Sequence, residues 1–178
     1  MKNRLFSVAM AAAVIFAACG TPRDTNTLST TSSNPAYSTP DNLRTVFVAQ
    51  YPSATNVTWT AFDAAVVPID WEMTGWTTLD ADDHAVSFEM DGQRYLAWYD
   101  SDGTWVGSTY VVDDYSKLPS AVQSLISTKY SGYTVQKVHQ EMWKDKLAYE
   151  IKLKRTDDDK VKLIVDNQGN ILKEKLKD

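Results

Sequence analysis

The sequence of 178 residues is poor in the side chains that build covalent, metal or nucleophilic sites. Cys19 is the single cysteine, and His84 and His139 are the only histidines. One cysteine excludes intrachain disulfides, thiolate metal clusters and a downstream cysteine nucleophile. The two histidines stand at different places in the repeating pattern described below, and no nucleophile elbow, phosphate loop or zinc-binding helix occurs. We therefore predict a non-enzymatic protein with no catalytic residue, no cofactor and no metal site.

An excess of positive charge is also lacking. The chain has 18 Lys and Arg against 23 Asp and Glu, a formal net charge of −5, and its sequence shows no basic stripe. Binding to phosphates requires such a stripe. We therefore expect no nucleic acid among the partners.

Long apolar runs are absent apart from one near the start. It extends from Val8 to Ala18, follows two basic residues, and is shorter than the roughly 20 residues that cross a bilayer. A positive start, an apolar middle and small residues at the end are typical of a secretory signal peptide, here residues 1–18. The stretch FAAC resembles the lipobox of bacterial lipoproteins, which implies lipidation of Cys19. The alternative is an ordinary signal peptide followed by an incidental cysteine.

Cleavage after residue 18 would remove Lys2 and Arg4 and no acidic residue, which changes the formal net charge from −5 to −7. Attachment to a membrane is therefore expected from acyl chains alone. Residues 19–40 are rich in Ser, Thr, Asn and Pro, which predicts a lipidated cysteine followed by a flexible tether. No dense acidic run of the kind associated with surface display follows the cysteine. We therefore expect an outer membrane lipoprotein on the periplasmic side of the cell envelope.

Residues 41–178 form one predicted domain, in which the same order of patterns occurs twice, at about 41–112 and about 116–178. Each half opens with apolar residues at helical spacing. Asp41 is predicted as the N-cap of the first helix, and Pro119 is expected in the first turn of the second. The predicted buried helix residues are Val46, Phe47 and Tyr51 in the first half and Val122, Leu125, Ile126 and Tyr130 in the second.

Alternation with a period of two follows each helix and predicts strands with one buried and one solvated face. The segments that show it are HAVSFEMDGQ and RYLAWYDSDGTWVGS in the first half, and KLAYEIKLKR and KVKLIVDNQGNILKE in the second. In KLAYEIKLKR the inward residues are Leu147, Tyr149, Ile151 and Leu153, and the solvated ones are Ala148, Glu150, Lys152 and Lys154. Short turns join consecutive strands. We therefore predict an α+β fold, a tandem repeat of a helix followed by an antiparallel meander sheet of about four strands, with the helices on one face.

Several short motifs carry a resemblance to a known family. They are a helix ending in YP, the following VTW, the turn YDSDGTW, and LPSAV at the start of the second half. This pattern resembles the PepSY-like family, whose fold is related to beta-lactamase inhibitor protein and which is common among secreted or lipid-anchored proteins of Bacteroidetes-type bacteria. The resemblance implies a tandem helix-plus-sheet module that binds another protein and can inhibit it. It implies no catalytic residues.

The connection between the first two strands differs between the halves. In the second half it is the tight EMWKDKL, whereas in the first half it includes residues 63–83, an insertion of around a dozen residues. Loops of this length in compact domains are functional or disordered, and the apolar side chains here argue against disorder. Either the insertion folds back over a sheet with Trp71 and Trp76 in the core, or it presents these tryptophans to a partner. A ligand pocket is the third interpretation.

The strand that ends at Tyr99 carries a second anomaly on its outward side. The turn YDSDG of the first half can be aligned with VDNQG of the second. This alignment places Tyr95, Ala97 and Tyr99 opposite the inward residues Val161, Leu163 and Val165. It places Leu96 and Trp98 opposite the outward residues Lys162 and Ile164. Trp98 with Leu96, joined by Trp59, is therefore a candidate contact patch on an open sheet face. The alternative is that the insertion covers this patch. Exposure of Trp98 would favour a binding surface, and burial against Trp71 or Trp76 would count against it.

Two acidic clusters are weak site candidates. Asp100–Gly103 resembles the start of a calcium loop but lacks the later acidic ligands, so we predict a turn. Asp80–His84 combines three carboxylates with an imidazole. We predict a solvated acidic loop there, with a metal site as the alternative.

Three classes of function remain open from the sequence. The favoured one is a protein-binding, inhibitory module whose partner is an unknown envelope protein. The second is a binder of carbohydrate or another small envelope ligand, which exposed tryptophans would also serve. An enzyme is the least favoured, because no group of residues supplies both an activated side chain and one that orients it.

Overall fold

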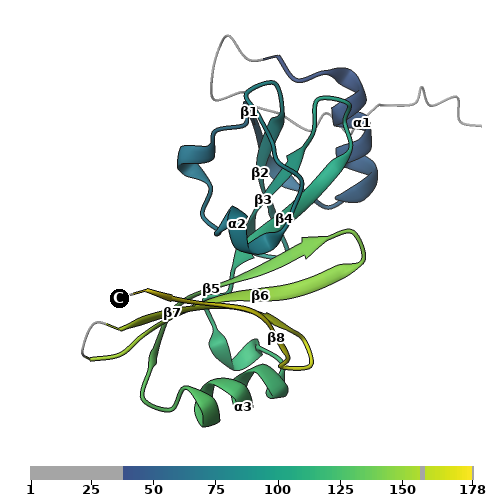
Figure 1. Cartoon of the computed structure of the whole chain (residues 1–178). Coiled ribbons are helices and arrows are strands. Elements are labelled where there is room, and N and C mark those ends of the chain that lie inside the picture. The colour runs from purple at the N-terminus through teal and green to yellow at the C-terminus, as the bar shows by residue number, and fades with distance from the viewer. Residues whose placement is uncertain (1–37, 157–158, 178) are drawn as a thin grey trace, which may run out of the picture.

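The computed structural model describes residues 38–156 and 159–177 (Figure 1). The elements in chain order are α1 (Asp41–Gln50), β1 (Thr55–Ala61), the 3-10 turn η1 (Ala64–Val66), α2 (Trp71–Thr74), β2 (His84–Met90), β3 (Gln93–Tyr99), β4 (Trp105–Val111), the 3-10 turn η2 (Tyr115–Lys117), α3 (Ser120–Lys129), β5 (Thr134–Trp143), β6 (Lys146–Lys154), β7 (Lys160–Asp166) and β8 (Ile171–Lys177). The predicted signal peptide and Cys19, the predicted site of lipidation, lie outside the described residues. In the part of the chain that the structure describes, no helix is both long and apolar enough to cross a membrane.

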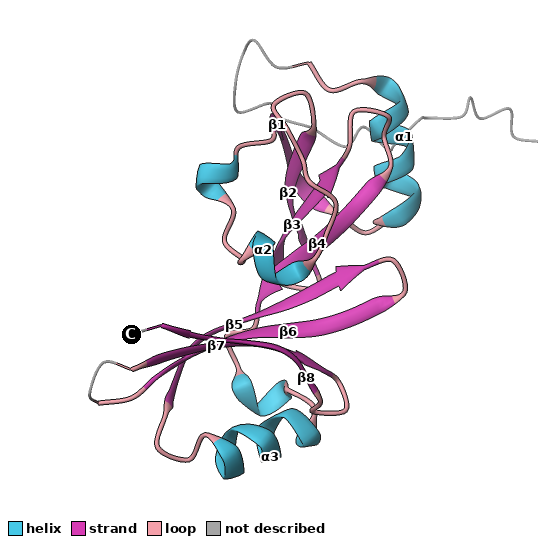
Figure 2. Cartoon of the chain, viewed as in Figure 1, coloured by secondary structure: helices cyan, strands magenta, loops and turns pink. Residues whose placement is uncertain are grey.

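The strands form one antiparallel sheet of eight strands, ordered β1 to β8 as in the sequence. The helix α1 lies beside β1–β4 and α3 beside β5–β8 (Figures 1 and 2). The predicted α+β class and antiparallel meander are confirmed. The sheet is continuous, however, because β4 pairs with β5 between Ser108 and Val111, whereas the sequence predicted a separate sheet in each half.

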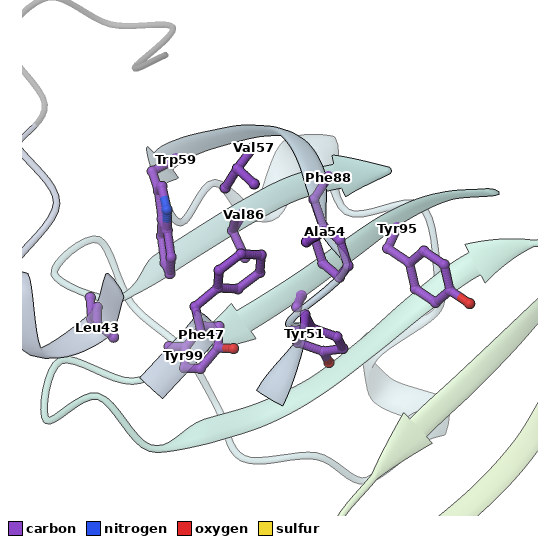
Figure 3. Packing of buried hydrophobic residues seen from close by; sticks show 11 residues of the cluster. Leu43, Phe47, Tyr51, Ala54, Val57, Trp59, Val86, Phe88, Tyr95 and Tyr99 are labelled. Atoms are coloured by element: carbon purple, nitrogen blue, oxygen red, sulfur yellow. The ribbon is translucent and has the colours of Figure 1, made fainter. Parts of the chain in front are cut away.

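An aromatic cluster fills the space between α1 and the first four strands (Figure 3). The ring of Phe47 lies 5.0 Å from that of Phe88 and 5.5 Å from that of Trp59, both edge-on. Edge-on packing of this kind adds to the gain from burying the rings. Tyr95, Ala97 and Tyr99 point into the same cluster, as the alternation of their strand predicts.

A second cluster fills the space between α3 and β5–β8. Val122 and Tyr130 of the helix are buried there, with Leu125 and Ile126 packed at its edge. The inward strand residues are Tyr149, Ile151, Leu153, Val161, Leu163 and Val165. Both helices therefore cover one face of the sheet, and the inward and outward assignments made from the sequence are confirmed for these strands.

The start and the buried side of α1 differ from the prediction. Pro40 is the N-cap and Asp41 is the first helical residue; Pro119 likewise caps α3 instead of lying in its first turn. Val46 is 41% exposed, and Leu43 is buried in its place. Residues 43, 47 and 51 are spaced by four, so they form one stripe along the helix, and Val46 lies beside it.

Candidate functional site: the loop face of the sheet

Residues 62–83, called here the β1–β2 loop, cover part of the sheet face opposite α1 and α3, which we call the loop face. The base of the loop is closed by a hydrogen bond from the Phe62 N–H to the Asp83 carbonyl at 2.8 Å. Its short helix α2 lies between the two halves of the sheet (Figure 2). In the second half, only Lys144 and Asp145 connect β5 and β6. The loop therefore reaches far beyond the hairpin that it connects.

Trp98 lies under this loop and is 2% exposed. The ring of Trp71 is 5.3 Å away and that of Trp76 is 5.7 Å away, both edge-on. Ile69 and Leu79 of the loop complete the same cluster. The structure thus agrees with the interpretation in which the loop covers Trp98. The alternative, an open contact patch that includes Trp98, is wrong.

The other candidate side chains are buried or half-buried. Trp59 is 1% exposed on the opposite face, under α1, because its register partner is Val86, an inward residue. Trp76 is 8% exposed and Trp71 is half-buried. Leu96 is half-buried at the rim of the Trp98 cluster. The tryptophans stabilise the fold, whereas Leu96 also lines the groove described below.

Gly107 gives Trp76 its place on the sheet. Gly107 is the register partner of Trp98 on β4, and a Cβ atom there would lie 2.6 Å from the indole of Trp76. No side chain larger than hydrogen fits at that distance without moving the ring. The same indole lies 5.8 Å from the ring of Trp143 on β5. One loop residue thus contacts both halves of the sheet.

The loop also covers the side of β6 that the sequence assigned to solvent. Met73 packs on Ala148 and Ile164. Ala148 and Glu150 are both 0% exposed, so the expectation that they lie on a solvated face is wrong. The predicted alternation of inward and outward residues along β6 is correct. The outward residues Ala148 and Glu150, however, are covered by the β1–β2 loop of the first half instead of by water.

Asp70 anchors the loop on the second half through charge. Lys162 Nζ donates a hydrogen bond to Asp70 Oδ2, and Lys175 Nζ lies 3.6 Å from the same oxygen. Burial works against ionisation of Asp70, but the hydrogen bond and charge of Lys162, with the charge of Lys175, outweigh it and lower the pKa of the carboxyl. Asp70 is therefore ionised over the physiological pH range.

Backbone groups of the loop add two further bonds. The Asp70 N–H donates to Glu150 Oε2 at 2.6 Å, and Lys152 Nζ donates to the Pro68 carbonyl at 3.2 Å. Lys152 also pairs with Glu150 at 3.2 Å. Because Glu150 is fully buried, these two partners offset part of the cost of removing its side chain from water.

His139, Glu141 and Glu150 form a buried polar group beneath the loop, each 0% exposed. Among the described residues, neither ring nitrogen of His139 and neither carboxylate oxygen of Glu141 has a hydrogen-bond partner. Burial, together with repulsion from Glu150 and Asp70, raises the pKa of Glu141 to about 8. Burial and the nearby lysines lower the pKa of His139 to about 4, so both side chains are mainly neutral at pH 7.

A groove of about 660 Å³ lies on the part of the loop face that the loop leaves uncovered. It runs beside Pro68 across β2 to β5. Its lining includes Ser87, Arg94, Leu96, Thr109, Lys137 and His139. The groove combines the cations of Arg94 and Lys137 with the carboxylate of Asp113 and the buried imidazole of His139, and it leaves part of this face open.

The two acidic clusters serve as turns. Asp100 Oδ1 accepts hydrogen bonds from the Asp102 and Thr104 N–H groups, and Gly103 has a φ of +89°. Asp83 accepts from the Asp80 and Ser101 N–H groups. Within residues 38–156 and 159–177, no group of three or more His, Cys, Asp or Glu side chains is placed to hold a metal ion.

Comparison with known proteins identifies the family. The sequence profile described as "Putative beta-lactamase-inhibitor-like, PepSY-like" matches residues 82–173, about half of the chain. The chain belongs to the PepSY-like family. The resemblance found in the short sequence motifs is thereby confirmed, and no match is found among curated proteins.

Solved structures share the fold of this PepSY-like chain. A DUF2874 family protein of Bacteroides ovatus matches with a TM-score of 0.61 and 21% identity, over 79% of this chain and 89% of that one. A BLIP-like protein of Bacteroides fragilis matches with a TM-score of 0.60 and 18% identity over the same shares. A Bacteroides eggerthii structure described as "putative periplasmic proteins" has a TM-score of 0.58 and 17% identity, over 79% of this chain and 90% of that one. At these identities the likeness shows the fold alone.

Replacing Asp70 by Asn should release the loop without changing its shape. The amide cannot balance the charges of Lys162 and Lys175, so we expect the free energy of unfolding to fall by about 1–3 kcal/mol in urea titrations. Amide exchange of the loop should become faster. Glu72→Gln removes a carboxylate that is 86% exposed and pairs with Lys175, and it should leave stability unchanged. Equal effects of the two variants would contradict the anchoring role of Asp70.

Proposed function

We propose that this chain is a non-enzymatic lipoprotein of the cell envelope that binds another protein through the loop face of its sheet. The observation that supports it best is the contrast between the two faces. Within the described residues both helices cover one face, whereas the other carries the β1–β2 loop and an open groove of about 660 Å³. A sheet face that its own chain leaves partly uncovered is a surface for association. Membership in a beta-lactamase-inhibitor-like family is consistent with a protein partner and with inhibition of it.

The loop offers an apolar tip to such a partner. Val66, in the 3-10 turn η1, is 72% exposed, and Ala64 and Ala65 beside it are exposed as well. The tryptophans of the loop hold it on the sheet, so Val66 and the groove residues, and not the indoles, would meet the partner. We infer that the loop stabilises the face and shapes it for one partner.

We also infer that the domain arose by duplication. The order α1 then β1–β4 is the same as α3 then β5–β8, and both helices lie on the same face. The β1–β2 loop is then an insertion in the first copy, since the corresponding connection in the second has two residues, Lys144 and Asp145. An insertion in the first copy alone explains why the two halves differ in length and why the first half supplies the segment that covers the loop face.

The anchoring part of the proposal rests on the FAAC stretch and on the signal-like residues 1–18. Lipidation of Cys19 would hold the domain at the outer membrane through the tether of residues 19–40, on the periplasmic side. The printed description of the Bacteroides eggerthii structure is consistent with that compartment.

Photo-cross-linking in living cells tests the proposed binding face. A photoreactive amino acid at Val66, or at Val111 in the groove, should yield the same discrete cross-linked protein. Val48, which is 41% exposed on α1, is the control position on the helix face and should yield none. The purified domain should compete the product away. Products only at Val48, or none at any position, would overturn the proposal.

A second candidate function is the binding of a carbohydrate or another small envelope ligand in the groove. The observation that favours it is the polar lining of the groove, where Ser87 and Gln93 are half-buried, since such groups orient polar ligands. Failure of cross-linking, together with a rise in melting temperature on addition of envelope glycans, would favour this candidate.

A further inference from the structure

A glutamine interrupts the apolar inward side of β5. Its neighbours on that side, Val138 and Met142, pack into the clusters under α3 and α1 respectively. Gln140 between them is half-buried and lies in register between Tyr110 on β4 and Tyr149 on β6. Tyr110 packs against both clusters. Gln140 therefore marks the place on the helix face where the core of one half ends and that of the other begins.

A cavity of about 180 Å³ lies at this place. Its lining comes from both halves and from the connection between β4 and α3, and it includes Gln93, Tyr110, Asp113, Lys117, Gln140 and Tyr149. Ligand sites occur preferentially where structural units meet. The volume is below the range of about 300–1,000 Å³ that is usual for drug-sized ligands, so the cavity suits one small ring.

The polar groups of this lining keep unused hydrogen-bonding capacity. Tyr110 Oη donates to Gln140 Oε1 at 2.9 Å, which leaves both N–H donors of the Gln140 amide and a lone pair of the phenol oxygen. Within the described residues, the side chains of Gln93 and Asp113 and the hydroxyl of Tyr149 have no hydrogen-bond partner. A ligand in the cavity therefore has to offer both hydrogen-bond donors and acceptors.

A sugar ring meets this requirement. Each of its hydroxyls both donates and accepts, and two neighbouring hydroxyls can bond together to the two polar atoms of one amide or one carboxylate. The C–H groups of the ring carry a slight positive charge and pack on the electron-rich faces of aromatic rings, which Tyr110 and Tyr149 supply. A purely apolar ligand would leave the amides of Gln93 and Gln140 without partners.

Charge selects among sugars. The lining carries the two carboxylates of Asp113 and Asp114 against the single ammonium of Lys117, so its formal charge is negative. Carboxylates accept hydrogen bonds from hydroxyls but repel the carboxylate of a uronic acid. A neutral ring therefore fits this lining better than an acidic one.

We infer that the cavity binds one neutral sugar ring, the terminal unit of a glycan chain. This site goes beyond the proposed function, because it lies on the helix face, whereas the proposed protein partner binds on the loop face. Gln93, Tyr110 and Asp113 line both the cavity and the loop-face groove, so the two sites adjoin. Gln140 and Tyr149 belong to the cavity alone, and Arg94 belongs to the groove alone.

NMR signals of the side-chain amides test the inference directly. The ¹⁵N-labelled protein is titrated with the methyl glycosides of glucose, galactose, mannose and N-acetylglucosamine, one at a time. At least one of them should shift the amide signals of Gln93 and Gln140 to saturation. The signal of Gln136, which is exposed on the same strand as Gln140, should stay in place. If none of these glycosides shifts the Gln140 signal to saturation, the inference is wrong.

A pair of variants on β5 separates the cavity from general effects. Gln140→Leu keeps the approximate size of the side chain and removes its amide, and it should weaken binding of the tightest glycoside about fivefold or more. Gln136→Leu makes the same change outside the cavity and should leave affinity unchanged. Melting temperatures show whether both variants are folded. Equal affinity of Gln140→Leu and the wild type would overturn the inference.

A second pair uses exposed positions, where the fold is not at risk. Asp113→Ala removes a carboxylate of the lining and should also weaken binding. Asp145→Ala makes the same change in the β5–β6 turn and should not. Equal affinities of these two variants would count against the cavity. So would tighter binding of methyl glucuronide than of every neutral glycoside, because the site would then select an anion.

Another variant distinguishes the cavity from the groove on the loop face. Arg94→Gln changes an exposed residue that lines the groove and not the cavity, and it should leave the affinity for the glycoside unchanged. If Arg94→Gln weakens binding as much as Gln140→Leu does, the sugar lies in the groove and the inference is wrong.

Failure of this inference differs from failure of the proposed function. The cross-links at Val66 and Val111 should persist in Gln140→Leu at wild-type yield. If they form and no glycoside binds, the sugar site is wrong and the protein-binding face stands. If no protein is cross-linked in the wild type but the Gln140 amide signal shifts to saturation, the proposed protein partner is wrong and the sugar site stands.

Discussion

Replacing Trp98 by Ala should lower the free energy of unfolding by about 3–5 kcal/mol, as expected for deletion of a buried indole from a packed core. Trp98 is 2% exposed and touches the rings of both Trp71 and Trp76. Its removal leaves a cavity under the β1–β2 loop, and the loop loses part of the surface on which it packs. Urea unfolding measures the stability, and hydrogen exchange at the Asp70 and Met73 amides measures the release of the loop.

Trp59→Ala is the matched control for Trp98→Ala. Trp59 is equally buried, at 1% exposure, but it packs under α1 on the other face. We expect a similar loss of stability with no selective increase in exchange of the loop amides. If the two variants loosen the loop equally, the loop does not depend on Trp98. A loss of partner capture in Trp98→Ala would then be a consequence of reduced stability, because this side chain cannot reach a partner directly.

Glu141→Gln should remove a fall in stability that the wild type shows between about pH 6.5 and pH 8. The folded pKa of Glu141 is raised from 4.5 to about 8, first by burial and then by Glu150 and Asp70. Between these two pH values the folded state holds one proton more than the unfolded state, so stability falls with rising pH by about 1.4 kcal/mol per unit. From pH 4.5 to pH 8 the ionisation of Glu141 alone therefore lowers the free energy of unfolding by about 4–5 kcal/mol.

His139 makes the free energy of unfolding change with pH in the opposite direction. Its folded pKa is lowered from 6.5 to about 4, so its contribution is complete above pH 6.5 and is lost as the pH falls toward 4. The two slopes therefore cancel between about pH 4.5 and 6.5, and the slope of Glu141 remains above pH 6.5. Glu141→Gln should be more stable than the wild type at pH 8.5 by about 3–5 kcal/mol and no more stable at pH 5.

Urea titrations from pH 5 to pH 9 measure this pH dependence. Glu174→Gln makes the same chemical change on the helix face, where Glu174 contacts Lys129 and Tyr130, and should keep the wild-type slope. An unchanged slope in Glu141→Gln would show that the carboxyl is ionised in the folded state. The negative charge of Glu141 in the buried polar group would then have to be stabilised by an interaction other than those described above.

Alternation along the strands was predictable from the sequence because it is a local property. The identities of Tyr95, Ala97 and Tyr99, and of Val161, Leu163 and Val165, were sufficient to assign them to the helix face. The helices were also predictable from their spacing, with errors of one residue at each start. Trp59 was assigned to the wrong face because no alternating run extended around it, and its register with β2 was required.

The outward lysines of β6 were visible in the sequence as residues that alternate with inward ones, Lys152 and Lys154. Their pairing with Lys162 and Lys160 on β7 required the register of the two strands. The anchoring role of Asp70 and the burial of Glu150 gave no signal of their own, since an acidic residue in a loop and one on a polar strand face are both ordinary.

The sequence by itself determined the two helices, the alternating strands, the extra length of the β1–β2 loop and the family. Only the tertiary structure decided where that loop lies. Its key contacts join the Asp70 N–H to Glu150 and the Asp70 carboxylate to Lys162, across 80 and 92 residues of chain. The physical reason is that alternation and helical spacing depend on neighbouring residues, whereas the cover on a sheet face depends on which distant segment gains most free energy by excluding water from it.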